Sequence, residues 1–468
     1  MNYQKIFING QWVKPSTSER IEVENPANKT IIGSVPASKE EDVNKAVAAA
    51  KEAYKTWQFS SKEERIELLT KLVKELRARE DEMVDIIVKE LGSPRDYARK
   101  THVVPYVDEM EYLTNLLKDY PLEEKHDGFT IVKEGVGVVA AITPWNFPLG
   151  QITKKVAPAL LSGSTIVVKP SQKTPLIAYV LAEAIDKVGF PKGVFNLVPG
   201  KGSDVGNPLA SHPDVDLVTF TGSTKGGKEL SKLAADDIKR VVLELGGKSP
   251  AVILDGTDFK DAVGKVLNKI YTNTGQSCTA LSRLIVPLKE KENIEKMIIE
   301  LTKEYKVGDP ETVDPMLIGP LSSRQQFDKV KGYLELGLNE GAKMLLGEIP
   351  EKSDGYFVKP AVFTDVTNDM TIAKEEIFGP VLCLITYETL EEAIEIANDT
   401  DYGLSSAVFG PEEEALDVAR QIKAGDVRVN NTSSSYKAPF GGFKHSGIGR
   451  ESSKYGLEEF LEIKVIYL

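Results

Sequence analysis

Cysteine and histidine are scarce in this sequence. Its 468 residues include two cysteines, Cys278 and Cys383, and four histidines. Two cysteines cannot form a disulfide framework, and they make no C-x-x-C pair for zinc binding or redox exchange. The histidines are dispersed and form no H-E-x-x-H pattern, so we expect no metal site. This cysteine usage is typical of a cytoplasmic protein.

Long apolar runs and an excess of positive charge are also lacking. No run of 18 apolar residues occurs, and the N-terminal segment MNYQKIFINGQWVKP reaches polar residues too early for a signal peptide. We therefore expect no membrane partner. The chain carries 58 Lys and Arg against 70 Asp and Glu, a net charge of -12 with a pI near 5.2. Such a chain repels a polyanion on average, which excludes nucleic acid as its main partner.

What the sequence has is a long alternation of strand-like and helical segments. From residue 135 onward, short β-rich runs such as 135–143, 164–170 and 215–222 alternate with helical patterns, and a second series covers about 258–410. Alternation of this kind predicts βαβ units and parallel sheets, and hence two α/β domains. Before them, residues 38–120 have helical periodicity, with Ser38 and Glu41 as a candidate capping box.

Two strand-like segments lie outside both series. These are residues 127–136 and the C-terminal residues 460–468. The last strand has no later partner in the sequence. We expect it to be an edge strand that is able to pair with another subunit.

Two glycine motifs each leave alternatives open. Gly200, Gly202 and Gly206 have the spacing G-x-G-x-x-x-G, one residue too long for a dinucleotide fingerprint. The run from Gly222 to Lys228 has the P-loop spacing, but Glu229 stands where a P-loop needs Ser or Thr to hold Mg²⁺. What remains is a strand, a Gly-Ser turn and a helix start, which can hold a pyrophosphate or serve only as a tight turn.

Three residues are candidates for chemistry. Cys278 lies among small and polar residues in TGQSCTALSR, unlike Cys383 in VLCLI, so it is the better candidate for a reactive thiol. Glu244 interrupts an apolar strand before two glycines, and is either a functional carboxylate or half of a structural ion pair. Asn146 lies between two prolines in TPWNFP, where the alternatives are a positioned amide and a plain turn.

Together these segments resemble the aldehyde dehydrogenase superfamily, specifically its non-phosphorylating, hydrolytic members. The resemblance covers essentially the whole chain and rests on TPWNFP, KPS, FTGS, LELGGKSP, GQSC, EEIFGPV and PFGGFKHSGIGRE. It implies a Rossmann-like NAD(P)-binding domain (1–117 and 136–246), a catalytic domain (247–445) and a small β oligomerisation element (118–135 and 446–468). It also implies a homodimer or homotetramer.

The resemblance assigns roles to the three candidates. Cys278 is the nucleophile that attacks the aldehyde, and the Asn146 amide with the Cys278 N–H forms the oxyanion hole. Glu244 activates the water that hydrolyses the thioester. Lys155 and Glu451 align with residues implicated in proton relay.

The resemblance also implies the cofactor, NAD or NADP, and its site. Gln172 stands where relatives that prefer NAD commonly have Glu, and Lys173 adds positive charge, so we expect NADP to be accepted as well. Lys169 and Glu376 match residues that hold the riboses, Phe378 packs near the nicotinamide, and Ser223 meets the pyrophosphate. The full set of cofactor residues is Ile142, Thr143, Trp145, Lys169, Ser171, Gln172, Gly202, Gly222, Ser223, Leu245, Glu376 and Phe378.

The substrate is expected to be a small-molecule aldehyde, medium-sized and either aliphatic or aromatic. In the family alignment its tunnel is lined by Phe147, Gln151, Lys154, Ser277, Thr279, Ser434 and Phe440. We expect the flexible Lys154 to extend to solvent at the tunnel mouth rather than to bind a substrate carboxylate. Two other readings remain: a CoA-acylating aldehyde dehydrogenase, which needs no base such as Glu244, and a non-catalytic binding protein of the same fold.

Overall fold

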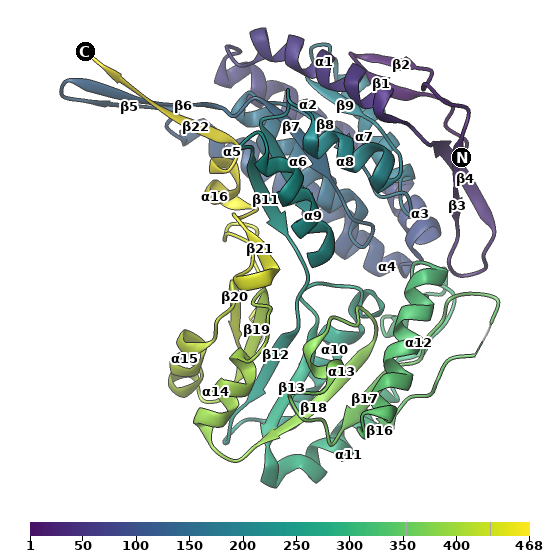
Figure 1. Cartoon of the computed structure of the whole chain (residues 1–468). Coiled ribbons are helices and arrows are strands. Elements are labelled where there is room, and N and C mark those ends of the chain that lie inside the picture. The colour runs from purple at the N-terminus through teal and green to yellow at the C-terminus, as the bar shows by residue number, and fades with distance from the viewer. Residues whose placement is uncertain (352, 431) are drawn as a thin grey trace.

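The structure is a computed structural model that describes residues 1–351, 353–430 and 432–468. It has two lobes, each built around a large, mainly parallel sheet, and a narrow three-stranded arm that ends at the C-terminus (Figure 1). The predicted α/β fold is therefore confirmed. Among the described helices, none combines the length and the apolar character needed to cross a membrane.

The first lobe contains an eight-stranded sheet with the order β2-β1-β9-β8-β7-β10-β11-β21. Strands β7 to β11 are parallel, whereas β1 and β21 run antiparallel to their neighbours β9 and β11. Strand β7 is buried along its whole length because helices cover both faces of the sheet. The strands are β1 Ile6–Ile8, β2 Gln11–Val13, β7 Val138–Ile142, β8 Thr165–Lys169, β9 Phe195–Leu197, β10 Leu217–Thr221, β11 Arg240–Glu244 and β21 Gly447–Ile448.

Each face of this sheet has its own hydrophobic core. Along β7, Val139 and Ala141 belong to the core under α2, α3, α5, α6 and α7, whereas Val138 and Ala140 belong to the core under α1, α8 and α9. The helices are α1 Glu40–Trp57, α2 Lys62–Ala78, α3 Glu80–Leu91, α4 Arg95–Tyr97, α5 Val104–Asp119, α6 Pro148–Ser162, α7 Leu176–Val188, α8 Asn207–Ser211 and α9 Thr224–Ala235.

The predicted capping box at the start of α1 is wrong. The Ser38 N–H donates to the carbonyl of Pro199 at 3.0 Å, which keeps Ser38 in the preceding loop. The helix begins at Glu40, and the Asp42 carboxylate accepts a hydrogen bond from the Lys39 N–H at 3.2 Å.

The direction of strand addition reverses between β7 and β10. Strands β8 and β9 follow β7 on one side, and the chain then returns to place β10 and β11 on the other. At such a point the two connections leave the sheet in opposite directions, and a crevice opens at the carboxyl ends of the strands. In this sheet the order reverses between β7 and β10. The segments that follow them, after Ile142 and Thr221, therefore lie on either side of this crevice.

The second lobe contains a seven-stranded sheet with the order β16-β17-β18-β13-β12-β19-β20, parallel except for β16. Its strands are β12 Ser249–Ile253, β13 Leu281–Pro287, β16 Lys343–Leu346, β17 Ala361–Thr364, β18 Val381–Tyr387, β19 Ser405–Phe409 and β20 Asp426–Val429. Its helices are α10 Phe259–Tyr271, α11 Lys291–Thr302, α12 Arg324–Asn339, α13 Thr371–Lys374, α14 Leu390–Asn398 and α15 Glu412–Gln421.

The two sheets follow one another directly along the chain. Strand β11 ends at Glu244 and β12 begins at Ser249, so the carboxyl end of the first sheet leads to the amino end of the second (Figure 1). Side chains at these two sheet ends therefore meet between the lobes.

The arm is the antiparallel sheet β22-β6-β5, which projects from the first lobe (Figure 1). The C-terminal strand pairs with β6 from Leu461 opposite Gly135 to Tyr467 opposite Phe129. The two strands expected outside the α/β series thus pair with each other, with β22 at an edge. The remaining elements are β3 Arg20–Glu24, β4 Ile31–Pro36, β5 Glu123–His126, β6 Phe129–Gly135, β14 Lys306–Val307, β15 Leu317–Ile318, α16 Ser453–Glu458 and β22 Leu461–Tyr467.

Candidate active site

Many of the predicted cofactor residues lie at the carboxyl ends of parallel strands. Ile142 ends β7 and is followed by Thr143, Lys169 ends β8, and Gly222 and Ser223 follow β10. Leu245 follows β11 in the same way. This is the edge of the first sheet at which the strand order reverses, so the residues of separate motifs share one side of the lobe.

The Gly222-Ser223 turn leads into helix α9. A Cβ at Gly222 would lie 2.3 Å from the Phe220 ring, so any larger residue there would force this ring to move. The Ser223 hydroxyl accepts a hydrogen bond from the Gly226 N–H at 3.2 Å and caps the helix. At Gly202, a Cβ would meet no atom within 4 Å, so this glycine borders open space. A helix start beside open space is suited to an anionic group.

Lys169, Glu376, Trp145 and Phe378 surround the same edge of the sheet. Burial lowers the pKa of Lys169 to about 8. The Glu376 carboxylate accepts a hydrogen bond from the Gly247 N–H at 3.0 Å, and burial raises its pKa. The Phe378 ring meets the Trp145 ring edge-on, with 5.4 Å between the ring centroids. The backbone of Phe378 has a φ of 61°, which phenylalanine rarely adopts.

The two residues expected to govern cofactor choice have different surroundings. Gln172 is exposed, next to the buried Ser171. Lys173 is turned toward the other lobe, because its ammonium lies 5.1 Å from the Trp145 ring centroid and donates to the Ser323 hydroxyl at 3.0 Å. Burial lowers its pKa to about 8, and the charge of Lys329 adds to this effect. Gln172 is thus the freer of the two to meet a ligand.

The loop before Cys278 is strained and tied to Asn146. Asn273 and Thr274 have φ values of 52° and 57°, and Thr274 is β-branched, so this conformation is costly. The Asn273 amide donates to the carbonyls of Asn146 and Gln276 at 3.0 and 3.1 Å, and the Asn146 amide donates to the Gln276 carbonyl at 3.1 Å. Asn146 is therefore held against the Cys278 loop, with one N–H that has no partner among the described residues.

Cys278 is partly exposed at the junction of the two lobes. A Cβ at Gly247 would lie 2.4 Å from the Cys278 carbonyl oxygen. The second glycine of LELGG is therefore required where this turn passes the Cys278 loop. Burial raises the pKa of the thiol to about 12, and the negative charges of Glu376 and Glu244 add to the rise. The thiol is therefore protonated at neutral pH without a base or an added positive charge.

Glu244 is buried, and neither of its carboxylate oxygens has a hydrogen-bond partner in the described part of the chain. Burial raises its pKa well above 4.5, and the Glu451 charge raises it further. A Cβ at Gly441 would lie 2.6 Å from Oε1, so the carboxylate sits against a glycine of the PFGGF motif. Glu244 forms no ion pair with any of the described residues, so the structural alternative proposed for it finds no support.

Lys155 and Glu451 form a buried ion pair beside Glu244. Both are almost fully buried, and the Lys155 ammonium also donates to the Thr221 hydroxyl at 2.7 Å. The pair links α6 to the segment before α16, far apart in sequence. The predicted proton-relay residues thus lie together, while one Glu451 oxygen has no partner among the described atoms.

The expected tunnel residues come from both lobes. Gln151, Ser277 and Thr279 are buried, Lys154 and Phe440 are half-buried, and Ser434 is exposed. Two further residues were missed: Tyr106, whose ring lies against Gly150, and Glu109, which is buried on α5. An acidic residue on the apolar face of a helical pattern, beside Met110, is the signal that could have indicated Glu109.

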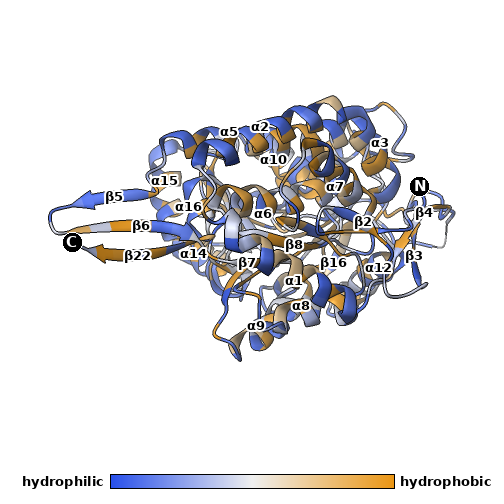
Figure 2. Ribbon diagram, turned by 90° about the horizontal axis from the view of Figure 1, so that it is seen from above, coloured by the Kyte–Doolittle hydropathy of each residue, from blue (hydrophilic) through white to orange (hydrophobic). Residues whose placement is uncertain are grey.

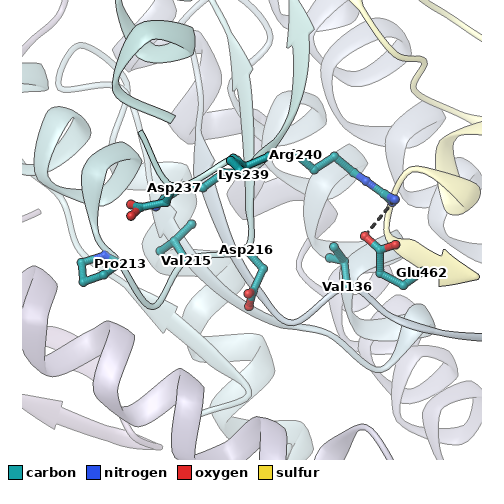
Figure 3. A pocket seen from close by; sticks show the side chains of 9 residues that line it. Val136, Pro213, Val215, Asp216, Asp237, Lys239, Arg240 and Glu462 are labelled. Atoms are coloured by element: carbon teal, nitrogen blue, oxygen red, sulfur yellow. Dashed lines mark hydrogen bonds and ion pairs between the residues drawn. The ribbon is translucent and has the colours of Figure 1, made fainter. Parts of the chain in front are cut away.

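Another pocket, of about 490 Å³, lies at the opposite edge of the first sheet (Figure 3). Val136, Asp216 and Lys239 stand just before the amino ends of β7, β10 and β11, whereas the candidate site lies at the carboxyl ends. Arg240 crosses this pocket to pair with Glu462 of β22 at 2.8 Å. This pocket is therefore separate from the candidate active site. In the described ranges, no three His, Cys, Asp or Glu side chains group as a metal site would require.

The fold and this site define the class of protein, a two-lobed α/β protein with a candidate cysteine site between its lobes. A profile of the Aldehyde dehydrogenase family matches residues 12–466. The chain belongs to the aldehyde dehydrogenase family, as the sequence motifs predicted.

Solved structures agree with this assignment. Aldehyde dehydrogenase C of Pseudomonas syringae, a cysteine-to-alanine variant in complex with NAD+ and octanal, is 41% identical with a TM-score of 0.98, over 99% of this chain and 96% of that one. An aldehyde dehydrogenase of Mycobacterium tuberculosis, in complex with NAD+, is 40% identical with a TM-score of 0.97, over 100% and 98%. Betaine aldehyde dehydrogenase of Staphylococcus aureus, in complex with NAD+, is 37% identical with a TM-score of 0.96, over 99% and 94%.

Proposed function

We propose that this protein oxidises an aldehyde to the carboxylic acid with NAD(P)+ and water, through a thioester on Cys278. The observation that carries the proposal is the buried, unpartnered carboxylate of Glu244 at the lobe junction. A buried carboxylate without a partner costs free energy, and such a cost is typical of a functional group. Its raised pKa suits a general base.

The residues at the carboxyl edge of the first sheet fit a dinucleotide. The capped start of α9 and the open space beside Gly202 suit a pyrophosphate, and Lys169 with the second oxygen of Glu376 suits ribose hydroxyls. Thr143 has a buried hydroxyl with no partner among the described residues, which a ligand could satisfy. When bound, the nicotinamide supplies the hydride acceptor. The NAD+ complexes of related enzymes support the same cofactor here, with NADP as a second one.

The chain's own residues provide for attack on the aldehyde. Cys278 forms the carbon–sulfur bond after its thiol proton passes to a base, for which Glu244 is the candidate because its charge reaches the thiol and both of its oxygens lack a partner among the described residues. The negative charge that develops on the aldehyde oxygen is stabilised by the Asn146 amide and the Cys278 N–H. Asn146 is oriented for this role because its other N–H is held by the Gln276 carbonyl.

Glu244 also serves the second half of the reaction. As a base it takes a proton from the water that attacks the thioester, which releases the acid and the Cys278 thiolate. The Lys155–Glu451 pair lies beside it and is suited to passing that proton onward. A CoA-acylating enzyme has no need of this base, so Glu244 favours hydrolysis. The intact Cys278, Glu244 and Asn146 weigh against a non-catalytic binding protein.

Substrate, assembly and location complete the proposal. We propose a medium-sized aliphatic or aromatic aldehyde as substrate, supported by the octanal complex of the Pseudomonas syringae enzyme. The domains are those implied by the family (1–117 and 136–246; 247–445; 118–135 and 446–468), although β21, within the last range, pairs with β11 of the first sheet. We propose a homodimer or homotetramer formed through the arm, and a cytoplasmic location in keeping with two free cysteines.

The experiment that tests this proposal is a panel of short, long, aromatic and semialdehyde substrates, each with NAD+ and with NADP+. Reduced-nicotinamide formation should appear with at least one class, stay unchanged on addition of CoA, and vanish in Cys278→Ala, which still binds the cofactor. Silence of the folded, cofactor-binding wild-type protein across the panel would overturn the proposal.

A further inference from the structure

Lys154 is a half-buried lysine of α6 whose ammonium faces two aromatic rings. Its Nζ lies 4.6 Å from the centroid of the Phe440 ring and 5.9 Å from that of Tyr106. No carboxylate of the described residues lies within 4.0 Å of it, whereas the next residue, Lys155, is paired with Glu451. From the sequence we expected Lys154 to extend to solvent at the tunnel mouth. In the structure its ammonium lies against two aromatic rings instead.

The two rings are fixed by the fold. Tyr106 packs on α6 one turn before Lys154, where a Cβ at Gly150 would lie 2.2 Å from the ring. Phe440 exchanges two main-chain hydrogen bonds with Glu451, at 2.7 and 2.8 Å. The position between the rings is thus part of the fold, since it depends on a glycine and a main-chain bridge.

The acidic groups around Lys154 do not neutralise it by direct contact. Burial alone would lower the pKa of Lys154, but the charges of nearby carboxylates, Glu109 first and then Glu451, outweigh burial and raise it. Of these, Glu451 is held by Lys155. Glu109 is buried with one oxygen unpartnered among the described residues, and burial raises its pKa. The charge of Lys154 is therefore left without a fixed counter-ion.

Lys154 also lies close enough to the reaction centre to act on it. Its charge lowers the pKa of the Cys278 thiol and that of Glu244, against the stronger effect of burial on both. A cation that is felt by both candidate catalytic groups is within reach of a substrate bound at Cys278.

We infer that Lys154 binds an anionic group at the far end of the substrate, so that the preferred aldehydes are ω-oxo carboxylates. The inference rests on the proposed function and names the substrate class of the same site. A substrate carboxylate would supply the missing counter-ion and accept a charge-assisted hydrogen bond from the ammonium. The aromatic rings would enclose this pair and keep it partly out of water.

The test compares ω-oxo carboxylates of four to eight carbons with uncharged aldehydes of the same chain length. For the best length, kcat/KM of the oxo acid should exceed that of its uncharged partner by about 10- to 100-fold, as expected for a hydrogen bond to a charged group. In Lys154→Met this ratio should fall to about one. Lys437→Ala is the matched control, because Lys437 is an exposed lysine near Phe440, and it should leave the ratio unchanged.

Each outcome decides the inference. A wild-type ratio near one, or a Lys154→Met variant that loses both substrates equally, would overturn it, the second result assigning Lys154 to the reaction itself. A preference for ω-hydroxy aldehydes over the oxo acids would overturn it too, since a hydroxyl could bond both Lys154 and Glu109. Activity on uncharged aldehydes alone would overturn the inference and leave the proposed function standing. The absence of activity on every aldehyde would contradict the proposed function itself, and the inference with it.

Binding of the product provides a second readout. A dicarboxylate should inhibit wild type more strongly than the monocarboxylate of equal length, and Lys154→Met should remove this difference.

Discussion

The Asn146 amide donates a hydrogen bond to the main-chain carbonyl of Gln276, two residues before Cys278, at 3.1 Å. These groups are 130 residues apart and belong to the first and the second lobe. One hydrogen bond thus sets the orientation of the amide relative to the thiol. The second N–H of the same amide is left for a developing negative charge.

Replacing Asn146 should therefore slow the chemistry more than it weakens the fold. For Asn146→Ala we expect kcat/KM to fall by about 100- to 1,000-fold, the usual effect of losing one oxyanion donor. The measurement is steady-state kinetics together with the melting temperature. Asn146→Asp, similar in size but without the N–H, should lose activity to a comparable extent; near-wild-type rates in either variant would remove Asn146 from the oxyanion hole.

Because Glu244 is buried without a partner among the described residues, its replacement by Gln should raise the stability of the fold while it lowers activity. Its pKa in the folded state is raised above 4.5, so folding favours the protonated form, and stability is lost as the pH rises from about 4.5 through the folded pKa. Gln cannot ionise and escapes this loss. At pH 8 we expect the free energy of unfolding of Glu244→Gln to exceed that of wild type by about 1–3 kcal/mol. This difference should shrink toward pH 5.

Urea denaturation at several pH values measures this gap. Glu229→Gln is the control, because Glu229 is exposed on α9 and its replacement should have little effect at any pH. A Glu244→Gln variant that is less stable than wild type at pH 8 would mean that the carboxylate has a stabilising partner, and would contradict its assignment as an unpaired base.

Much of the first lobe could be predicted from the sequence because its information is local. The apolar runs VVAAI and IVV lie in β7 and β8, and each strand is followed by turn residues, which marks both a buried parallel strand and the edge where ligands bind. For the same reason the residues after Ile142 and Thr221 could be assigned to one crevice. Local signals fail at Arg79, where α2 ends without Gly or Pro: its guanidinium bonds Glu82 and Glu183 instead.

The contacts that refine the site could not be predicted, because they join distant segments. Gly441 packs against Glu244, and Phe440 lies beside Lys154, only because the second lobe docks on the first. The surroundings of Lys173 are a similar case: its charge was expected beside Gln172, and the structure instead places it over Trp145. Such pairings depend on tertiary packing, which no motif encodes.

Gln172 should govern the choice between the two cofactors. In Gln172→Glu the new carboxylate would accept hydrogen bonds from the ribose and repel a 2′-phosphate, so the ratio of kcat/KM for NAD+ over NADP+ should rise by about 10- to 100-fold. Lys173→Ala should change both cofactors alike, because Lys173 is already engaged by Ser323. A wild-type preference for NAD+ already above about a hundredfold would contradict dual use.

The arm should hold the oligomer together. Strand β22 is an edge strand, and Figure 2 shows it as an apolar strand that projects from the body of the protein. Ile463 and Tyr467 are 69% and 81% exposed on one face of it, which is unfavourable in an isolated chain. We expect Ile463→Lys with Tyr467→Lys to convert the oligomer to a monomer, measured by light scattering, whereas Lys464→Gln leaves the mass unchanged. A monomeric wild type would contradict the assembly.

The central claim, a Cys278 thioester hydrolysed with the help of Glu244, is tested most directly by intact-mass spectrometry of Glu244→Gln after mixing with cofactor and aldehyde. We predict that reduced cofactor forms to no more than one equivalent per Cys278, more slowly than in wild type because the thiol has lost its proposed base, and that an added acyl mass on Cys278 persists because its hydrolysis lacks the same base. The same mixture with Cys278→Ala should show neither. Steady turnover of Glu244→Gln near the wild-type rate, with no acyl adduct, would contradict the account.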